Sequence, residues 1–342
     1  MPAFDAVLIV SFGGPQGRDD VRPFLENVLR GRRVAPGRIE EVAEHYQLFG
    51  GVSPLTGVTL RQAEGVRSRL AAAGMPVPVY VGMRNWHPYL EDTLGAMSRA
   101  GIRRAIGIIA AAHRSYSSCT QYRENVAAAR AGLAQAHQHD VEITYVGDWY
   151  AHEAFVEANA ARARTAIDSL PPALQDRAEL IFTAHSIPVS MAERYPYRQQ
   201  FEWTARLVAE RVNAGRRPAS SLGYAVAYQS RSGRPEDPWL GPDIGEQLRV
   251  TASRGTPAAV ICPVGFLIDH IEVLYDLDVE AAEVARGIGL TLARAGTVGE
   301  HPLFLDMLTD VVTTTARRYE RGTPLQIVPP PGAVSSGPAG RH

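Results

Sequence analysis

The chain has 342 residues and a formal net charge of −1 at pH 7, with 45% hydrophobic and 21% charged residues. This composition is typical of a soluble globular protein, and the length suggests two domains of ordinary size or one large one. A net charge near zero gives no electrostatic footprint for nucleic acid. The two cysteines, Cys119 and Cys262, are too few for a disulfide framework and favour a reducing, cytoplasmic setting.

No targeting or membrane segment is visible in the sequence. The first residues lack a basic region, and the apolar run at 6–10 is typical of a strand. The longest apolar stretch, 258–268, is too short to span a bilayer and contains Pro263 and Gly265. We therefore expect a soluble protein with no membrane segment. After about Gln326 the chain is rich in Pro, Gly and Ser, which predicts disorder.

Short apolar runs alternate with longer helical patterns from the first residues onward. The expected strands are Ala6–Phe12, Val77–Met83, Ala105–Ala110, Glu142–Val146, Leu180–Ala184, Gly223–Gln229, Ala258–Pro263 and Leu290–Ala293. The clearest helical stretches are Gly57–Ala73, Tyr122–Ala136, His152–Leu170, Phe201–Asn213 and Ile271–Gly287. This alternation predicts βαβ units, parallel sheets and right-handed crossovers.

The pattern divides into two halves of four strands each. We predict an N-terminal α/β half over residues 1–150, a C-terminal α/β half over 151–325 that carries the metal-site residues, and a disordered tail over 326–342. No residue-level repeat links the halves, so a duplication would rest on the order of elements alone. Ligands of such sheets bind beyond the carboxyl ends of the strands, often between domains.

The segment LIFTAHSIP, residues 180–188, ends an apolar strand with His185. A single His at a strand end is most often satisfied by neighbouring backbone groups. Imidazole is also a proton acceptor near neutral pH and a common metal ligand. The position at the carboxyl end of a core strand favours the functional interpretation, but both remain open on the residues alone.

A second segment begins at Cys262 and runs through a predicted helix. Glu272, Asp276 and Glu280 follow one another at i, i+4 and i+8, which places three carboxylates on one helix face. Such a stripe is either a solvated surface or a path for a cation, because carboxylate and imidazole together suit divalent first-row metals.

Three further segments carry candidate binding residues. The loop YQSRSGRPEDPWLGP displays Trp239, which either packs on the core or forms an aromatic wall for a flat ligand. A basic loop at 27–33 includes Arg30 and Arg32, which could bind carboxylates or be solvated surface. The hydroxyl-rich stretch at 115–120 could line a polar pocket or cap a helix. Neither GxGxxG nor a P-loop occurs, which argues against a nucleotide enzyme.

Taken together, these segments resemble the ferrochelatase family from Asp5 to about Arg321. The most specific motifs are AHSIP at 184–188, YQSRSG…WLGPD at 228–243 and CPVGFLIDHIEVLYDLD at 262–278, while SFGGP, GGVSPL and SSCTQY agree in order and spacing. The detail is similar to Gram-positive, actinobacterial enzymes, which metallate coproporphyrin III rather than protoporphyrin IX. Phe12 stands where many relatives have a Tyr that can ligate the product iron.

The resemblance implies a fold, a reaction and a site. The fold is α/β, with two similar doubly wound parallel-sheet halves, chelatase-like and Rossmann-type, facing each other across a cleft. The reaction is insertion of Fe²⁺ into a porphyrin for haem biosynthesis. The catalytic pair would be His185 and Glu272, and the metal-site residues His185, Glu272, Asp276 and Glu280. The porphyrin-contacting residues would be Ser53, Tyr122, Phe12, Arg30, Arg32, Tyr46 and Trp239.

The expected partners are coproporphyrin III and Fe²⁺, both as substrates, with no nucleic acid, and we expect a monomer. We expect no cofactor, because two cysteines cannot supply the four thiolates that a [2Fe–2S] cluster takes. Neutral His185 would accept pyrrole protons, while the carboxylate stripe would carry protons out or bring Fe²⁺ in. The alternatives are a protoporphyrin IX ferrochelatase, a chelatase for another tetrapyrrole such as sirohydrochlorin, and a non-catalytic haem or porphyrin carrier.

Overall fold

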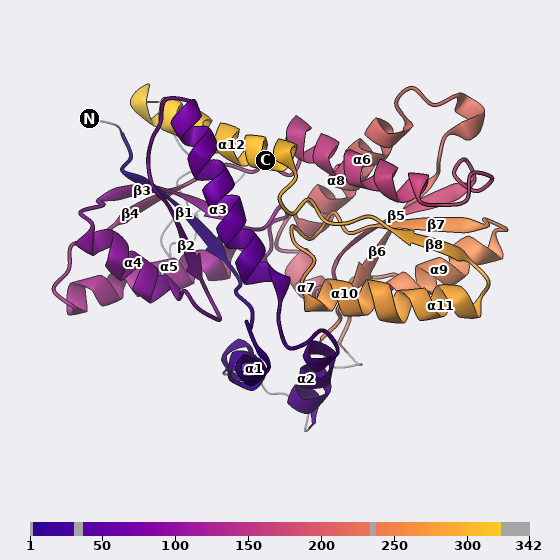
Figure 1. Cartoon of the computed structure of the whole chain (residues 1–342), viewed down its shortest axis with the longest axis horizontal. Coiled ribbons are helices and arrows are strands. Elements are labelled where there is room, and N and C mark those ends of the chain that lie inside the picture. The colour runs from indigo at the N-terminus through magenta and orange to yellow at the C-terminus, as the bar shows by residue number, and fades with distance from the viewer. Residues whose placement is uncertain (1–2, 31–36, 233–236, 323–342) are drawn as a thin grey trace, which may run out of the picture.

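The computed structural model describes residues 3–30, 37–232 and 237–322, and it contains two parallel sheets that lie side by side (Figure 1). The first has the order β2-β1-β3-β4 and the second the order β6-β5-β7-β8. Their strands are β1 Ala6–Ser11, β2 Val79–Met83, β3 Arg104–Ile109, β4 Glu142–Tyr145, β5 Ala178–His185, β6 Tyr224–Gln229, β7 Ala258–Cys262 and β8 Thr291–Arg294. All eight expected strands are confirmed.

Successive side chains of the central strands point to opposite faces of the sheet, so each sheet has a core on each face. In β1, Val7 and Ile9 face one core, while Leu8 and Val10 face another. In β5, Leu180 and Phe182 pack on one side and Ile181 on the other. Because both faces are covered by helices, these strands are mostly apolar, as expected for parallel sheets. The predicted class, α/β with two doubly wound parallel-sheet halves, is confirmed.

Helices cover both faces of each sheet. They are α1 Val21–Leu29, α2 Arg38–Leu48, α3 Pro54–Ala72, α4 Leu90–Arg99, α5 Gln121–Gln135, α6 Glu153–Asp168, α7 Val189–Ala192, α8 Tyr197–Asn213, α9 Ile244–Ser253, α10 Ile271–Leu274, α11 Ala281–Gly287 and α12 Pro302–Glu320. On the first sheet α4 and α5 pack on one face and α3 on the other; on the second, α6 and α8 pack opposite α9 and α11. None of the described helices combines the length and hydropathy needed to cross a bilayer.

Two parts of the chain connect the sheets. The last helix, α12, packs on α3 and α6, and its Phe304, Leu308 and Val312 belong to the core that β1 shares (Figure 1). Helices α1 and α2 project beneath the first sheet and reach the second half (Figure 1). His45 of α2 stacks on Tyr275, with ring centroids 3.6 Å apart. The N-terminal residues therefore extend to the helix that carries the predicted carboxylate stripe.

Candidate active site

His185 is the last residue of β5. Its ring nitrogen Nδ1 forms a short hydrogen bond with the carbonyl oxygen of Ser186. A carbonyl oxygen only accepts, so Nδ1 carries the hydrogen and the lone pair of the neutral ring lies on Nε2. Nε2 is 3.9 Å from Oε2 of Glu272, and the two side chains are 34% and 50% exposed. The geometry leaves Nε2 able to accept a proton or to bind a metal ion.

The loop after His185 is held by the loop that contains Trp239. The Val189 amide donates to the carbonyl of Pro238 at 3.0 Å, and the Leu240 amide donates to Ile187 at 3.0 Å. The Ser186 hydroxyl donates to the carbonyl of Leu240 at 2.7 Å. Two of the most specific sequence motifs therefore form one unit. This unit fixes the carbonyl that selects the His185 tautomer.

A close backbone approach brings the second motif to the same place. Gly265, in the loop after β7, donates its amide hydrogen to the carbonyl of Thr183 at 2.9 Å. A Cβ built on Gly265 would lie 2.4 Å from the Cβ of Ala184, so no larger residue fits without a shift. The glycine of CPVG thus lets the segment leading to Glu272 pass directly beside the end of β5.

The predicted helix at 271–287 exists but is not uniform. It runs as α10, a π-helical segment over Tyr275–Glu280, and α11. Asp276, in the π segment, accepts hydrogen bonds from the Ser230 hydroxyl and from Nε2 of Gln229. Burial, together with the negative charge of Glu272, raises the pKa of Asp276 to about 7, although the Ser230 bond opposes the shift. A carboxyl that titrates near neutrality can both accept and release protons.

The four predicted metal residues do not form one preformed shell. In the described residues, no group of three or more His, Cys, Asp or Glu side chains is placed to hold a metal ion together. His185 and Glu272 face each other, Asp276 is bonded to β6 and its loop, and Glu280 is exposed further along the helix. The metal roles of Asp276 and Glu280 therefore stay predictions.

His270 is a second imidazole that the sequence prediction missed. Its ring packs edge-on against Phe266 at 5.3 Å, and Phe266 in turn lies 6.4 Å from the ring of His185. Burial lowers the pKa of His270, an effect that the neighbouring His185 reinforces and Glu272 opposes. Its position immediately before the helix that carries Glu272 was the available signal.

Aromatic residues of the N-terminal half pack against the start of the Glu272 helix. Phe24 of α1 lies 6.2 Å from Phe12, 5.8 Å from Tyr46 and 6.2 Å from Trp86. Ile271 of α10 belongs to the same buried cluster. Burial and the nearby charge of Glu272 both raise the pKa of Tyr46, so its phenol stays protonated. Phe12 and Tyr46 are thus brought near the candidate pair, while Phe24 and Trp86 were not predicted.

The other predicted porphyrin contacts have mixed surroundings. Ser53 is buried and caps α3, its hydroxyl accepting from the Leu55 amide at 3.4 Å. Tyr122 is buried in the core under α5. Exposed Arg30 donates to the side chain of Asn27 at 2.6 Å. Trp239 is half-buried, and its indole Nε1 is buried without a hydrogen-bond partner in the described residues. Arg32 lies outside the described residues, so its predicted role remains a prediction.

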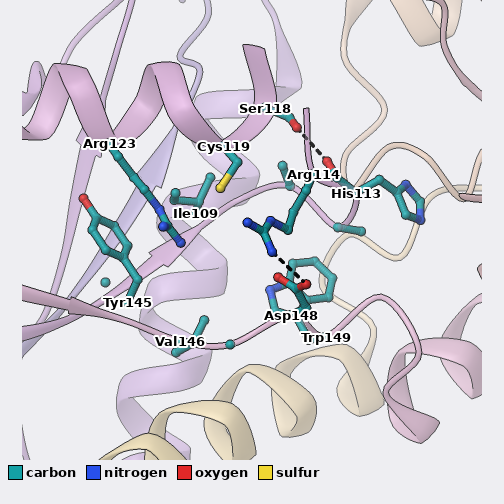
Figure 2. A pocket seen from close by; sticks show the side chains of 14 residues that line it. Ile109, His113, Arg114, Ser118, Cys119, Arg123, Tyr145, Val146, Asp148 and Trp149 are labelled. Carbon is teal, nitrogen blue, oxygen red and sulfur yellow. Dashed lines mark hydrogen bonds and ion pairs between the residues drawn. The ribbon is translucent and has the colours of Figure 1, made fainter. Parts of the chain in front are cut away.

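A pocket that is partly open to solvent lies at the carboxyl ends of β3 and β4 (Figure 2). Its walls include Arg114, Cys119, Arg123 and Asp148. None of the predicted catalytic or porphyrin-contacting residues lines it. The pocket is therefore a feature separate from the His185–Glu272 pair.

The fold is similar to that of a solved structure. The structure of SirB from Bacillus subtilis with Fe³⁺ matches with a TM-score of 0.55 at 13% identity, covering 94% of this chain and 99% of that one. A likeness at this identity concerns the fold alone. The match defines the class of the fold, an α/β protein with two parallel sheets, and the facing imidazole and carboxylate lie on that fold.

The family follows from the sequence comparisons. The ferrochelatase family model matches residues 4–316. The coproporphyrin III ferrochelatase of Mycolicibacterium smegmatis is 45% identical over 313 residues, covering 91% of this chain and 89% of that one. The enzyme of the same name from Mycobacterium avium is 43% identical over 342 residues, covering 97% and 94%. The chain belongs to the ferrochelatase family, as the sequence motifs predicted.

Proposed function

We propose that this protein is a cytoplasmic, monomeric coproporphyrin III ferrochelatase, which inserts Fe²⁺ into coproporphyrin III to give coprohaem. Family membership supports metal insertion into a porphyrin, and the relatives at 43–46% identity are named for coproporphyrin III. The observation that carries the proposal is the pairing of His185 Nε2 with the Glu272 carboxylate at 3.9 Å. Both substrates, porphyrin and metal ion, have a chemically suitable partner in this pair.

Metal insertion requires the porphyrin to lose its two pyrrole N–H protons. Neutral His185 accepts such a proton at Nε2, because Nδ1 is occupied by the Ser186 carbonyl. Glu272 stabilises the imidazolium that forms and presents oxygen to the incoming cation. Asp276, with a pKa of about 7, lies further along the same helix and can pass a proton toward solvent.

The four propionates of coproporphyrin require donors or cations. Arg30, Ser53, Tyr122, Tyr46 and Trp239 remain the proposed contacts, with Phe12 against the ring face. Exposed Arg30 offers the charge, and half-buried Trp239 offers an aromatic face. A porphyrin with four carboxylates can form more contacts with such groups than a porphyrin with two. This favours binding of coproporphyrin over protoporphyrin IX.

The substrate assignment is tested by offering Fe²⁺ with coproporphyrin III and with protoporphyrin IX under anaerobic conditions. We expect kcat/KM to favour coproporphyrin III, and Zn²⁺ to be inserted as well because it binds N and O ligands more tightly than Fe²⁺. Glu283→Gln, an exposed change on α11, serves as a control that should leave the preference unchanged. A clear preference for protoporphyrin IX would contradict the assignment.

We also propose that the protein holds no [2Fe–2S] cluster. Cys262 is buried in the core of the second half, and burial raises the pKa of its thiol to about 12. Cys119 lies in the pocket of the first half. Iron and acid-labile sulfide should be absent from purified protein in stoichiometric amount, and their presence would refute this proposal.

A further inference from the structure

The pocket at the ends of β3 and β4 collects more positive than negative charge. Arg114 follows β3 and Arg123 belongs to α5, and both side chains enter the pocket (Figure 2). Asp148 is the one carboxylate among the residues that line it. The pocket also contains His113, but burial lowers the pKa of that imidazole to about 3, so it is uncharged.

Arg123 has no ionic partner among the described residues. Its guanidinium lies over the ring of Tyr145, with Cζ 4.7 Å from the ring centroid. Its Nε is buried and makes no hydrogen bond. Burying a donor of a charged group without a partner costs free energy, and the contact with an aromatic face compensates for only part of that cost. Arg123 therefore has hydrogen-bonding capacity available on the pocket side.

Arg114 is only partly neutralised. Its Nη1 lies 3.3 Å from Oδ2 of Asp148, a long single contact rather than a bidentate pair. The same oxygen accepts a hydrogen bond from Nε2 of Gln200 at 3.1 Å. Nε of Arg114 is buried and has no partner in the described part of the chain. The lining thus holds two guanidinium groups but one carboxylate, and that carboxylate contacts Arg114 and Gln200.

We propose that this pocket binds a small oxyanion, of the phosphate or carboxylate class, between Arg114 and Arg123. Guanidinium groups present planar pairs of donors that match the oxygens of such anions. The excess positive charge of the lining disfavours a cation, and the two arginines disfavour an apolar ligand. The anion supplies negative charge that the single carboxylate of the lining does not.

Cys119 provides an independent probe of the same space. Its side chain lines the pocket and is partly exposed, whereas Cys262 is buried. Cys119 should therefore be the one thiol that an uncharged alkylating reagent modifies rapidly in the folded protein. An anion bound between Arg114 and Arg123 covers this thiol and slows its modification.

The test is titration of the metal-free, porphyrin-free protein with inorganic phosphate at constant ionic strength, followed by calorimetry and by the rate at which iodoacetamide modifies Cys119. We expect saturable binding in the wild type and protection of the thiol. Arg123→Gln should weaken binding about tenfold or more, the usual effect of losing one charge-assisted bond. Arg123→Lys keeps the charge but lacks the planar pair of guanidinium donors, so it should give an intermediate affinity.

Arg130→Gln is the matched control. It removes the same charge from the same helix, but Arg130 pairs with Asp140 outside the pocket. Phosphate affinity should be unchanged in this variant. Absence of saturable phosphate binding, or equal affinities in Arg123→Gln and Arg130→Gln, would overturn the proposal.

A competition experiment between phosphate and porphyrin identifies the source of the anion. If saturating phosphate leaves the affinity for coproporphyrin III unchanged, the pocket takes a free anion. If increasing concentrations of porphyrin displace the bound phosphate, the pocket takes a carboxylate of the substrate. Both results retain the oxyanion site, and the phosphate titration itself does not depend on the proposed ferrochelatase activity.

Discussion

The two halves of the molecule share one strand order but carry different chemistry after equivalent strands. β1 and β5 occupy the same position in their sheets. The chain that leaves β1 runs into Phe12 and two glycines, whereas β5 ends at His185. The chain that leaves β7 leads to His270 and Glu272, which lie near His185. The second half thus supplies the titratable groups, and the first supplies aromatic packing beside them.

The histidines after the strands show how burial decides what an imidazole does. His113 follows β3, is 3% exposed and bonds through Nε2 to Thr204 at 3.0 Å, so it connects the two halves as an uncharged structural group. His185 is partly exposed, and its Nε2 faces a carboxylate. Histidines at the carboxyl ends of parallel strands therefore do not all have the same role, which must be argued from the surroundings.

The largest expected effect separates these two histidines. His185→Ala should reduce turnover by about 10²–10⁴-fold, because a positioned general base typically contributes that much. Its thermal stability should change little, since the side chain is partly exposed. His113→Ala should instead lose about 2 kcal/mol of stability from its buried bond and packing, with turnover per folded molecule nearly unchanged. Steady-state rates and urea unfolding of both variants check this; near-wild-type turnover in His185→Ala would contradict the proposed mechanism.

Glu272→Gln should have the next largest effect. The substitution keeps the shape but removes the charge that faces His185, so we expect turnover to fall by about 10–100-fold while coproporphyrin affinity stays nearly constant. Glu283→Gln, which neutralises an exposed carboxylate of the same helix, is the control. Fluorescence titration of the porphyrin separates binding from turnover. Equal rates in the two variants would remove Glu272 from the mechanism.

Asp276 should make stability depend on pH in a predictable direction. Its pKa is about 7 in the folded protein, against 3.8 for an unperturbed aspartate, so the folded state binds more protons between these pH values. The contribution of Asp276 to the free energy of unfolding is therefore complete below about pH 4 and is lost as the pH rises through 7. Asp276→Asn should remove this dependence and gain about 1–2 kcal/mol relative to wild type between pH 5 and 8, after allowance for solvent screening. Urea unfolding across that range checks it; a constant difference between the two proteins would be inconsistent with the raised pKa.

The smallest expected effect concerns the contact between the halves through α2. His45→Ala removes the ring stacked on Tyr275 and should cost about 0.5–1.5 kcal/mol of stability, the usual contribution of an aromatic pair. The same variant should raise KM for the porphyrin more than it lowers kcat, because α2 lies beside the helix that carries Glu272. Unfolding measurements and steady-state kinetics check both parts. An unchanged KM would limit this contact to a structural role.

The sequence was most informative where hydrophobic pattern alone decides structure. The central strands β1, β3, β5 and β7 were predicted because buried parallel strands are nearly continuous apolar runs. The π-helical segment at 275–280 was not, since it depends on packing against residues distant in the chain. His270 and Arg123 were missed for the same reason, because their significance depends on their spatial neighbours. The pKa of Asp276 likewise depends on Ser230, which the sequence places 46 residues away.

The position of α12 has a consequence for synthesis of the chain. The helix is made after all eight described strands, yet its Phe304, Met307 and Val312 complete a core that also includes residues of strands β1 to β3. A nascent chain emerges from the ribosome in sequence order, and domains usually fold in that order. Here the first half cannot close its core until residues 302–320 have emerged. A ribosome that stalls shortly before this point would hold a chain with its first core open, and such a chain should be a substrate for chaperones or proteases.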